Sequence, residues 1–491
     1  MSFKPTPEQE HILDLYKTGQ HTVVEALAGT GKTLSLKLCA NYMRSRRGLY
    51  IAFNKSVAAE ARVTFAGTQV KAVTAHALAF PGFGAPRKAR LNTGKYVHWT
   101  ARSEVAGIQK HHFDSSENAS VDVLARETLS DLAVEAIKRF IESDAPEITE
   151  NMAGLPPMLM VTAEGAARLK ATVVGYAKRL WNDAVDLDGS LPITHAHYLK
   201  MYQLSCPRLN YEYIMLDEAQ DADPVMAAII KQQQTVQQIV VGDSNQAIYE
   251  WRNAIDVLKD YDGQRGALTQ SFRFGEAIAD EANLWLRAGG SPMEVKGLPS
   301  IASTVGRSRD LADAILCRSN AGAIKELMDA QQTSVTTAIA GDRKAEELRK
   351  FALAAEELRE TGSSGHPDFA TFKSWSDLVD FSNSTDGASL APLVKTVDSV
   401  GTEAIVSAID RTVSSEAARV TISTAHIAKG LEWDRVRISD DFFVPSEIED
   451  LEQEEARLGY VSVTRAKQHL DPGPLRGVRK IVRTTPAPAL V

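Results

Sequence analysis

One short segment constrains the fold of this chain more than any other. It reads Ala28-Gly29-Thr30-Gly31-Lys32-Thr33 and lies between a β-branched run at 22–24 and an apolar-periodic stretch at 34–43. The spacing predicts a strand, a glycine loop and a helix, in which backbone N–H groups hold phosphates, Lys32 reaches the β- and γ-phosphates and Thr33 binds Mg²⁺. Ala26 stands where the strict pattern has glycine, so the segment alone also fits a glycine-rich turn that binds nothing.

The rest of the chain alternates strand-like and helix-like patterns. After the loop we expect strands at 48–53, 69–73, 213–216, 238–241, 314–317, 419–423 and 435–439. Residues 81–205 and 321–420 carry mostly helical periodicity instead. Strands that alternate with helices predict an α/β fold with parallel sheets, interrupted here by mostly helical insertions.

A pair of acids follows one of these strands. Asp217 and Glu218 stand in Leu216-Asp217-Glu218-Ala219-Gln220, directly after a hydrophobic run. Hydrolysis of ATP needs one carboxylate to hold Mg²⁺ and a neighbour to activate water, so we assign Asp217 to the metal and Glu218 to the general base. Such acids are elsewhere solvated charges or helix caps, but a phosphate loop in the same chain makes that the minor alternative.

Composition bears on partners and compartment. The 491 residues include 55 Lys and Arg against 63 Asp and Glu, a net charge of −8, which by itself argues against nucleic acid as a partner. The three cysteines share no metal-ligand or disulfide spacing, and no apolar run is long enough to span a membrane. We therefore expect a cytoplasmic protein with no membrane partner.

An ordered set of further motifs accompanies these two. They are Val241-Gly242-Asp243-Ser244-Asn245-Gln246, Gln270-Ser271-Phe272-Arg273, Thr424-Ala425-His426-Ile427-Ala428-Lys429-Gly430-Leu431-Glu432 and Tyr460-Val461-Ser462-Val463-Thr464-Arg465-Ala466. The set resembles superfamily 1A DNA helicases of the UvrD/Rep type, over residues 7–80, 205–320 and 418–470. The segments Phe53-Asn54-Lys55-Ser56 and Val73-Thr74-Ala75-His76 look closest to the F-box DNA helicase branch and its phage-borne relatives.

The resemblance implies two tandem RecA-like parallel-sheet domains. Residues 1–82 and 205–265 would form domain 1A with the ATP site, and 83–204 the helical insertion 1B. Residues 266–320 and 418–491 would form domain 2A. Residues 321–417 would be a reduced 2B-like insertion, since the stretch between Asn320 and Thr424 is far shorter than the accessory insertion of full-length members.

The resemblance also assigns a nucleotide site that holds ATP and Mg²⁺. Gln9 would read the adenine edge, Phe272 would stack on adenine, and Gln246 would sense the γ-phosphate. Arg273 and Arg465 resemble paired arginine fingers, which neutralise transition-state charge. The remaining nucleotide contacts would come from Ala28, Gly29, Thr30, Gly31, Leu34, Arg252, Gly430 and Glu432. At Leu34, UvrD-type enzymes carry an arginine, so one base or ribose contact is in doubt.

A second set of residues would contact DNA. Tyr249 and Trp251 alternate, so both rings can face the bases from one side of an extended loop, and such stacking ignores base sequence. The resemblance adds Phe53, Asn54, Thr74, His76 and His426. Grip on DNA would then come from stacking and a local groove rather than from bulk charge, which reconciles a nucleic-acid partner with the charge of −8.

The implied function is an ATP hydrolase that moves along single-stranded DNA and unwinds tailed duplex DNA in the 3′→5′ direction, in repair, replication or recombination. A single-strand-binding or recombination protein is an expected partner. One alternative is a translocase that displaces bound protein without unwinding. An RNA-acting helicase is another, although such relatives carry Gln-Leu-Pro-Pro where this chain has Gln246-Ala247-Ile248-Tyr249. A third is a P-loop protein without motor activity.

Two weaker signals remain. Thr194-His195-Ala196-His197 has two histidines, but no third ligand is evident, so a structural or loop role is favoured over a metal site. Six basic residues and one acid lie between Pro81 and His112. They fit a surface that guides DNA and a solvated surface equally well.

Overall fold

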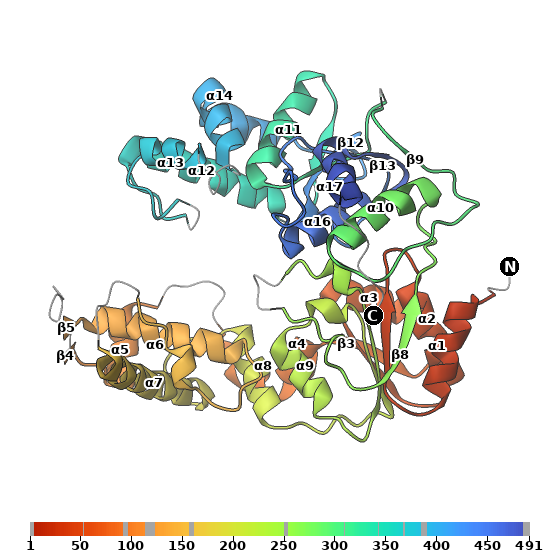
Figure 1. Cartoon of the computed structure of the whole chain (residues 1–491). Coiled ribbons are helices and arrows are strands. Elements are labelled where there is room, and N and C mark those ends of the chain that lie inside the picture. Colours follow the sequence, from red (N-terminus) through yellow and green to blue (C-terminus); the bar gives the residue numbers. More distant parts are fainter. Residues whose placement is uncertain are drawn as a thin grey trace. The chain divides into compact units, whose positions relative to one another are not determined.

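The computed structural model describes residues 4–52, 54–91, 97–112, 123–156, 162–249, 254–308, 310–341, 343–366, 369–383 and 390–484. The chain divides into two compact units (Figure 1). The first unit holds residues 1–25, 33–244 and 249–266, and the second holds 26–32, 245–248 and 267–491. The short segments 26–32 and 245–248 thus belong with the second unit, although their neighbours in sequence belong to the first.

A six-stranded sheet organises the first unit, with strand order β3-β2-β6-β7-β1-β8. Its strands are β1 (Thr22–Ala26), β2 (Gly48–Ala52), β3 (Val70–Thr74), β6 (Tyr213–Leu216), β7 (Gln237–Gly242) and β8 (Gln264–Leu268). The pairs from β3 through to β1 are all parallel. β2 and β6 are buried at every residue, which explains their unbroken apolar sequences, since parallel sheets are covered on both faces.

Helices precede or connect these strands. They are α1 (Pro7–Lys17), α2 (Lys32–Tyr42), α3 (Lys55–Thr64), α4 (Ala75–Ala79) and α9 (Pro224–Lys231). Because the strands are parallel, the carboxyl ends of β2, β3, β6 and β7 lie along one edge of the sheet, where ligands bind in open α/β sheets.

A helical insertion follows α4. It contains α5 (Trp99–Ala106), the two-residue strands β4 (His111–His112) and β5 (Val123–Leu124), α6 (Arg126–Ile141), α7 (Ala163–Val185) and α8 (His195–Leu204). α6 and α7 lie side by side over an apolar core (Figure 1). The fully buried Lys200 of α8 donates hydrogen bonds to the carbonyls of Ser143 (2.8 Å) and Ala145 (2.5 Å), and its ammonium lies 4.5 Å from the centre of the Phe140 ring.

The second unit contains another six-stranded sheet, with order β11-β12-β10-β13-β14-β9 and parallel pairing throughout. Its strands are β9 (Thr304–Val305), β10 (Ala314–Cys317), β11 (Thr337–Ile339), β12 (Val420–Thr424), β13 (Trp433–Ile438) and β14 (Ala466–Asp471). Two tandem parallel sheets with helical insertions confirm the expected fold class.

The helices of this unit are α10 (Glu276–Ala288), α11 (Asn320–Gln332), α12 (Lys344–Thr361), α13 (Trp375–Ser382), α14 (Ala391–Asp410), α15 (Ala425–Ala428), α16 (Gln453–Val463) and α17 (Val478–Thr484). α11 to α14 share one apolar core with β10 and β12. β11 is an edge strand of the sheet inside the range that sequence periodicity predicted to be helical. Within the described ranges, no helix has the length and apolar character needed to cross a membrane.

Candidate active site

The phosphate-loop segment forms the expected strand, turn and helix. It runs from the end of β1 at Ala26 to the start of α2 at Lys32, with Gly29 (φ +75°) and Gly31 (φ +79°) in the left-handed region. The buried Thr30 hydroxyl donates to the Leu27 carbonyl at 2.8 Å and braces the turn. A loop that delivers its backbone to the first turn of a helix suits an anionic phosphate.

Residues of the second unit hold this loop in shape. The Ala28 N–H donates to the hydroxyl of Tyr460 at 2.9 Å, and the Phe272 N–H donates to the Gly29 carbonyl at 2.8 Å. A Cβ on Gly29 would lie 2.5 Å from the Ser271 hydroxyl, so the position also needs glycine for space. Sequence reasoning placed Phe272 near the nucleotide but did not single out Tyr460, although Tyr460 opens the motif that ends in Arg465-Ala466.

The acidic pair lies where β6 ends. The buried Asp217 carboxylate accepts hydrogen bonds from the Tyr50 hydroxyl (2.7 Å) and from the Glu218 N–H (2.9 Å). Burial and the neighbouring Asp217 raise the pKa of Tyr50, so this phenol stays a donor at neutral pH. Glu218 adopts a left-handed backbone (φ 52°, ψ 45°), which is uncommon without glycine and concentrates at functional sites.

Two further side chains, not predicted from sequence, join this acidic edge. Gln220 donates to the Glu218 carboxylate at 2.7 Å and accepts from the Asp243 N–H at 3.0 Å, which links the ends of β6 and β7. Glu25, near the end of β1, accepts from the N–H (2.6 Å) and hydroxyl (2.9 Å) of Ser244. Burial, and secondarily Asp243, raise the pKa of Glu25 to about 7.

The two predicted arginine fingers lie in the second unit, each in a defined set of contacts. Arg273 donates to the Glu432 carboxylate (2.7 Å) and to the Thr464 carbonyl (3.1 Å). Arg465 is almost fully buried and donates to the Val461 carbonyl (2.8 Å) and the Thr464 hydroxyl (2.9 Å). Its guanidinium also reaches the side-chain oxygen of Gln246 at 3.3 Å, so the structure brings Arg465 and Gln246 together.

Two more basic residues hold the backbone of the same segment. The Lys429 ammonium donates to the Gln246 carbonyl at 2.5 Å, and the buried Arg457 guanidinium donates to the Ala247 carbonyl at 3.2 Å. The sequence indicates both basic residues only through their position in or near the quoted motifs, because Lys429 lies beside Gly430 and Arg457 lies three residues before Tyr460. Gly430 has φ +85°, in keeping with a tight turn after α15.

Gln9 lies in the first turn of α1. Its side-chain oxygen accepts the Thr6 N–H at 3.1 Å, while the Thr6 hydroxyl accepts the Gln9 N–H at 3.2 Å, which forms a capping box. The Gln9 amide nitrogen is buried and has no hydrogen-bond partner among the described residues. A buried donor without a partner costs free energy, so this group is suited to a ligand acceptor such as an adenine nitrogen.

The predicted DNA contacts of the first unit lie just after its strands. Asn54 caps α3 by accepting the Val57 N–H at 2.9 Å, and Thr74 caps α4 by accepting the Ala77 N–H at 3.2 Å. His76 follows on α4 and is half-buried. Of the other predicted DNA contacts, Tyr249 is half-buried and His426 lies on α15 in the second unit. Of the predicted nucleotide and metal contacts on α2, Thr33 is exposed and Leu34 is half-buried. Phe53, Trp251 and Arg252 lie outside the described residues.

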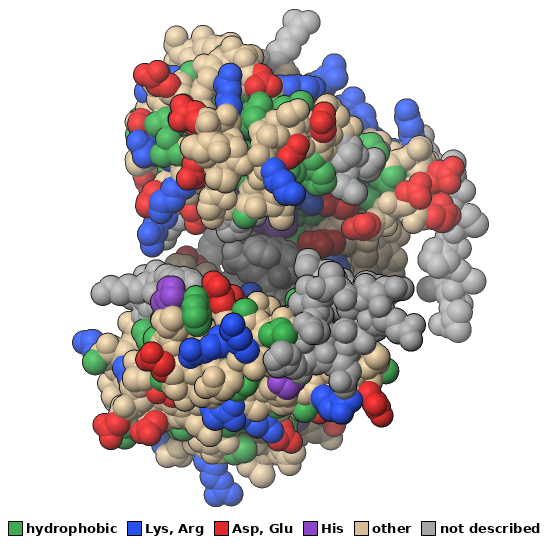
Figure 2. Space-filling view, turned by 90° about the vertical axis from the view of Figure 1, so that its left-hand side faces the viewer, with side chains coloured by type: hydrophobic (Ala, Val, Ile, Leu, Met, Phe, Trp, Pro, Cys, Tyr) green, Lys and Arg blue, Asp and Glu red, His purple; other side chains and the backbone are tan. Residues whose placement is uncertain are grey.

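The basic segment after Pro81 is partly structural. Arg87 donates to the carbonyls of Phe83 and Val185, and Arg90 donates to three carbonyls and pairs with Asp183 at 2.9 Å. These two guanidinium groups stabilise the insertion rather than form a free basic surface. On the face in Figure 2, described Lys and Arg side chains are interspersed with Asp and Glu, as the net charge of −8 leads one to expect.

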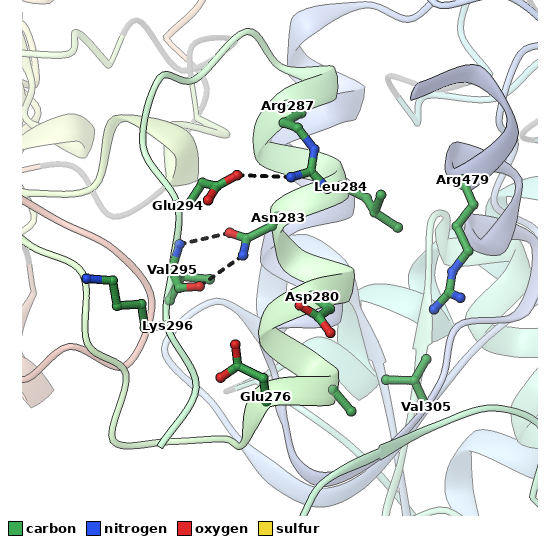
Figure 3. Close-up of a pocket in the computed structure, with 11 residues that line it drawn as sticks. Glu276, Asp280, Asn283, Leu284, Arg287, Glu294, Val295, Lys296, Val305 and Arg479 are labelled. Atoms are coloured by element: carbon green, nitrogen blue, oxygen red, sulfur yellow. Dashed lines mark hydrogen bonds and ion pairs between the residues drawn. The ribbon is translucent and has the colours of Figure 1, made fainter. Parts of the chain in front are cut away.

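A pocket of about 540 Å³ in the second unit contains none of the predicted residues (Figure 3). Asn283 of α10 donates to the Val295 carbonyl at 2.9 Å and accepts the Val295 N–H at 2.8 Å, and Arg287 pairs with Glu294 at 3.0 Å (Figure 3). These polar groups satisfy one another, so the pocket is not the candidate site.

Comparisons with known proteins identify the family to which the chain belongs. The UvrD/REP helicase N-terminal domain matches residues 6–259, and the UvrD-like helicase C-terminal domain matches residues 220–471. The chain is 28% identical to F-box DNA helicase protein 1 of Schizosaccharomyces pombe and 29% identical to F-box DNA helicase 1 of Gallus gallus, over 95% of its own length in both cases. It spans only 57% and 49% of these two relatives.

Among solved structures, an arterivirus nonstructural protein 10 helicase in complex with DNA aligns with 96% of this chain and 65% of its own, at 11% identity and a TM-score of 0.33. A score this low establishes no common fold. The two family domains, by contrast, each cover more than half of the chain and together extend from residue 6 to residue 471. The chain belongs to the UvrD/Rep helicase family.

Proposed function

We propose that this protein is an ATP-dependent translocase on single-stranded DNA and a 3′→5′ DNA helicase. One observation carries the proposal: the phosphate loop is held by Tyr460, in the same motif as Arg465, while the ends of β6 and β7 present acids joined by Gln220. A loop for phosphates, a carboxylate edge and buried arginines are the parts that phosphoryl transfer uses. The names of the two relatives and the family membership support DNA as the substrate.

In the proposed reaction, ATP binds with its phosphates on the backbone of Ala28, Gly29, Thr30 and Gly31 and on Lys32. Gln9 recognises adenine through its unpaired amide nitrogen, and Phe272 stacks on the base. Leu34, Arg252, Gly430 and Glu432 complete the proposed nucleotide contacts. Glu218 accepts a proton from the attacking water, and Arg273 and Arg465 stabilise the charge on the transferred group. Gln246, which touches Arg465, relays the state of the γ-phosphate to the segment that leads to Tyr249.

Thr33 and Asp217 would hold Mg²⁺. A hydroxyl and a carboxylate are the hard oxygen ligands that Mg²⁺ takes, and Mg²⁺ keeps several waters and phosphate oxygens rather than an all-protein cage. No cluster of three or more His, Cys, Asp or Glu side chains suited to a metal occurs among the described residues. When bound, the ion would neutralise phosphate charge.

DNA would be held by aromatic stacking at Phe53, Tyr249 and Trp251 and by backbone contacts from Asn54, Thr74, His76 and His426. We also propose the four-part division in which 1–82 with 205–265 and 266–320 with 418–491 are the motor domains, 83–204 is insertion 1B and 321–417 a reduced 2B-like region. A single-strand-binding or recombination protein is the proposed partner, and repair, replication or recombination the setting.

The test starts with the ATPase rate with and without single-stranded DNA, and continues with unwinding of 3′- and 5′-tailed duplexes. We expect stimulation by DNA and unwinding only of the 3′-tailed duplex. Displacement of streptavidin from a biotinylated strand without unwinding would support the translocase alternative. Stimulation by RNA and not by DNA would overturn the assignment of the substrate.

A further inference from the structure

The Thr194–His197 segment contains two histidines with different surroundings. His197 accepts the Thr194 N–H through Nδ1 at 3.2 Å, and its ring stacks on Trp181 with 6.1 Å between centroids and 19° between planes. Burial lowers the pKa of His197 to about 4, so this imidazole stays neutral at physiological pH. His197 therefore has a structural role at the start of α8.

His195 lies on the outside of the same turn and is exposed. Its ring centroid lies 6.2 Å from that of His76 and 5.5 Å from that of Tyr198, and its Nδ1 is 3.1 Å from the Tyr198 hydroxyl. His76 in turn lies edge-on to Tyr198 at 5.8 Å. The helical insertion and the end of β3 thus place one exposed and one half-buried imidazole against one buried tyrosine.

A charged group that interacts with His76 is Asp223, the N-cap of α9. Its carboxylate accepts the Met226 N–H at 2.8 Å and is largely buried, which raises its pKa. Asp223 favours the protonated form of His76, but burial and the neighbouring His195 outweigh it and lower the pKa of His76. Two adjacent imidazoles repel when both are protonated, and a bound anion would remove that penalty.

We propose that His195 is a further DNA-contacting residue, which binds the phosphate backbone of single-stranded DNA together with His76. The proposal rests on the proposed function, because His76 stands in the Thr74-Ala75-His76 segment assigned to the DNA backbone. Tyr198 is the positioning residue. Its hydroxyl engages Nδ1 of His195, so that Nε2 of that ring is left to face the phosphate.

The experiment measures the binding of a fluorescently labelled oligo(dT) strand by anisotropy at pH 6.0, 7.0 and 8.0. Compared with the wild type, His195→Ala should weaken binding at pH 6.0 by about 3- to 10-fold, since the net contribution of a typical hydrogen bond corresponds to about that much. His195→Gln, which keeps a side-chain donor, should bind better than His195→Ala.

His11→Ala is the matched control, because His11 is an exposed histidine on α1 of the same unit. It should bind as the wild type does at every pH. Tyr198→Phe, which keeps the ring and removes the hydroxyl, should weaken binding less than His195→Ala. Combining His76→Ala with His195→Ala should cost less than the product of the two separate losses, because the two imidazoles share one phosphate contact.

Wild-type affinity for oligo(dT) in His195→Ala, with a normal circular dichroism spectrum and melting temperature, would overturn the inference and leave the proposed function intact. A wild-type protein that fails to bind oligo(dT) under all conditions would overturn both.

Discussion

The same three residues, Thr-Ala-His, end one strand in each unit. Thr74-Ala75-His76 joins β3 to α4 in the first unit, and Thr424-Ala425-His426 joins β12 to α15 in the second. The Thr74 hydroxyl caps its helix, whereas Thr424 makes no such side-chain cap in the described part of the chain. His76 lies against rings supplied by α8. A tripeptide can thus specify a strand end and a helix start, while residues far away in sequence decide what its side chains do.

The two units differ more strongly in the charge of the side chains that they contribute to the candidate site. The first presents Glu25, Asp217, Glu218 and Asp243 around β1, β6 and β7, and the second unit presents Arg273, Arg457 and Arg465. In phosphoryl transfer, carboxylates hold the metal ion and activate water, whereas arginines stabilise the charge on the transferred group, so the two sets have different proposed roles. We therefore expect matched substitutions in the two units to have different effects.

The largest effect is expected at Glu218, the proposed general base. Glu218→Gln should reduce ATP hydrolysis by at least about 100-fold while ATP binding is retained, because general-base catalysis contributes about 10²- to 10⁴-fold. Glu432→Gln is the matched change in the second unit. It removes a partly exposed ion pair with Arg273, for which about 0.2–1 kcal/mol is typical, so the ATPase rate should fall by less than about 5-fold. Steady-state kinetics and nucleotide titration would check both variants. Equal losses of ATPase activity in the two variants would contradict the prediction that the acid of the first unit matters more than the acid of the second.

The next effect concerns pH and Glu25. Its folded-state pKa of about 7 lies above its usual 4.5, so the folded chain holds this proton more tightly than the unfolded chain does. The stabilisation is therefore complete below about pH 4.5 and is lost as the pH rises towards about 7. Glu25→Gln should remove this loss, on the order of 1–3 kcal/mol between pH 5 and pH 8.

Urea denaturation of the wild type and Glu25→Gln across that pH range measures the difference. Glu60→Gln, an exposed acid on α3, is the control and should keep the wild-type pH dependence. Parallel curves for wild type and Glu25→Gln would show that Glu25 does not titrate in this range.

A smaller effect is expected where the second unit holds the phosphate loop. Tyr460→Phe leaves the buried Ala28 N–H without its partner, at a cost of about 1 kcal/mol or somewhat more, and should raise KM for ATP by about 3- to 10-fold. Tyr176→Phe is the matched control, because the Tyr176 hydroxyl also accepts a backbone N–H, that of Gln109, in the helical insertion. An equal change in KM for both variants would show that the Tyr460 hydroxyl has no specific role in nucleotide binding.

The smallest effect returns to the shared tripeptide. Thr74→Val removes a helix cap and should lower the free energy of unfolding by about 1 kcal/mol, whereas Thr424→Val should lower it by less than about half of that. Chemical denaturation checks both. A larger loss at Thr424 would mean that the two strand ends are built alike after all.

Local sequence predicted the phosphate loop and eight of the twelve strands in the two large sheets, but it missed β8, β9, β11 and β14. The expected strands 213–216 and 314–317 coincide with β6 and β10, because a buried parallel strand needs an unbroken apolar run. β11 escaped prediction because three residues show no period. Tyr50, Gln220 and Tyr460 escaped for another reason. Tyr50 contacts Asp217, Gln220 contacts Asp243, and Tyr460 contacts Ala28. Hydrogen bonds between residues this far apart in sequence depend on the order of the strands in the sheet, which the spacing of residues along the chain does not reveal.

The buried Lys200 has a mechanical consequence. Its ammonium ties α8 to the end of α6, and α8 also packs on α4 and α9 beside the sheet. Burial lowers the pKa of Lys200 to about 8. Its hydrogen bonds to two carbonyls restrict movement of α8 relative to the end of α6. A displacement of α6 and α7 would therefore be transmitted through α8 to α4 and α9 rather than be absorbed by a hinge.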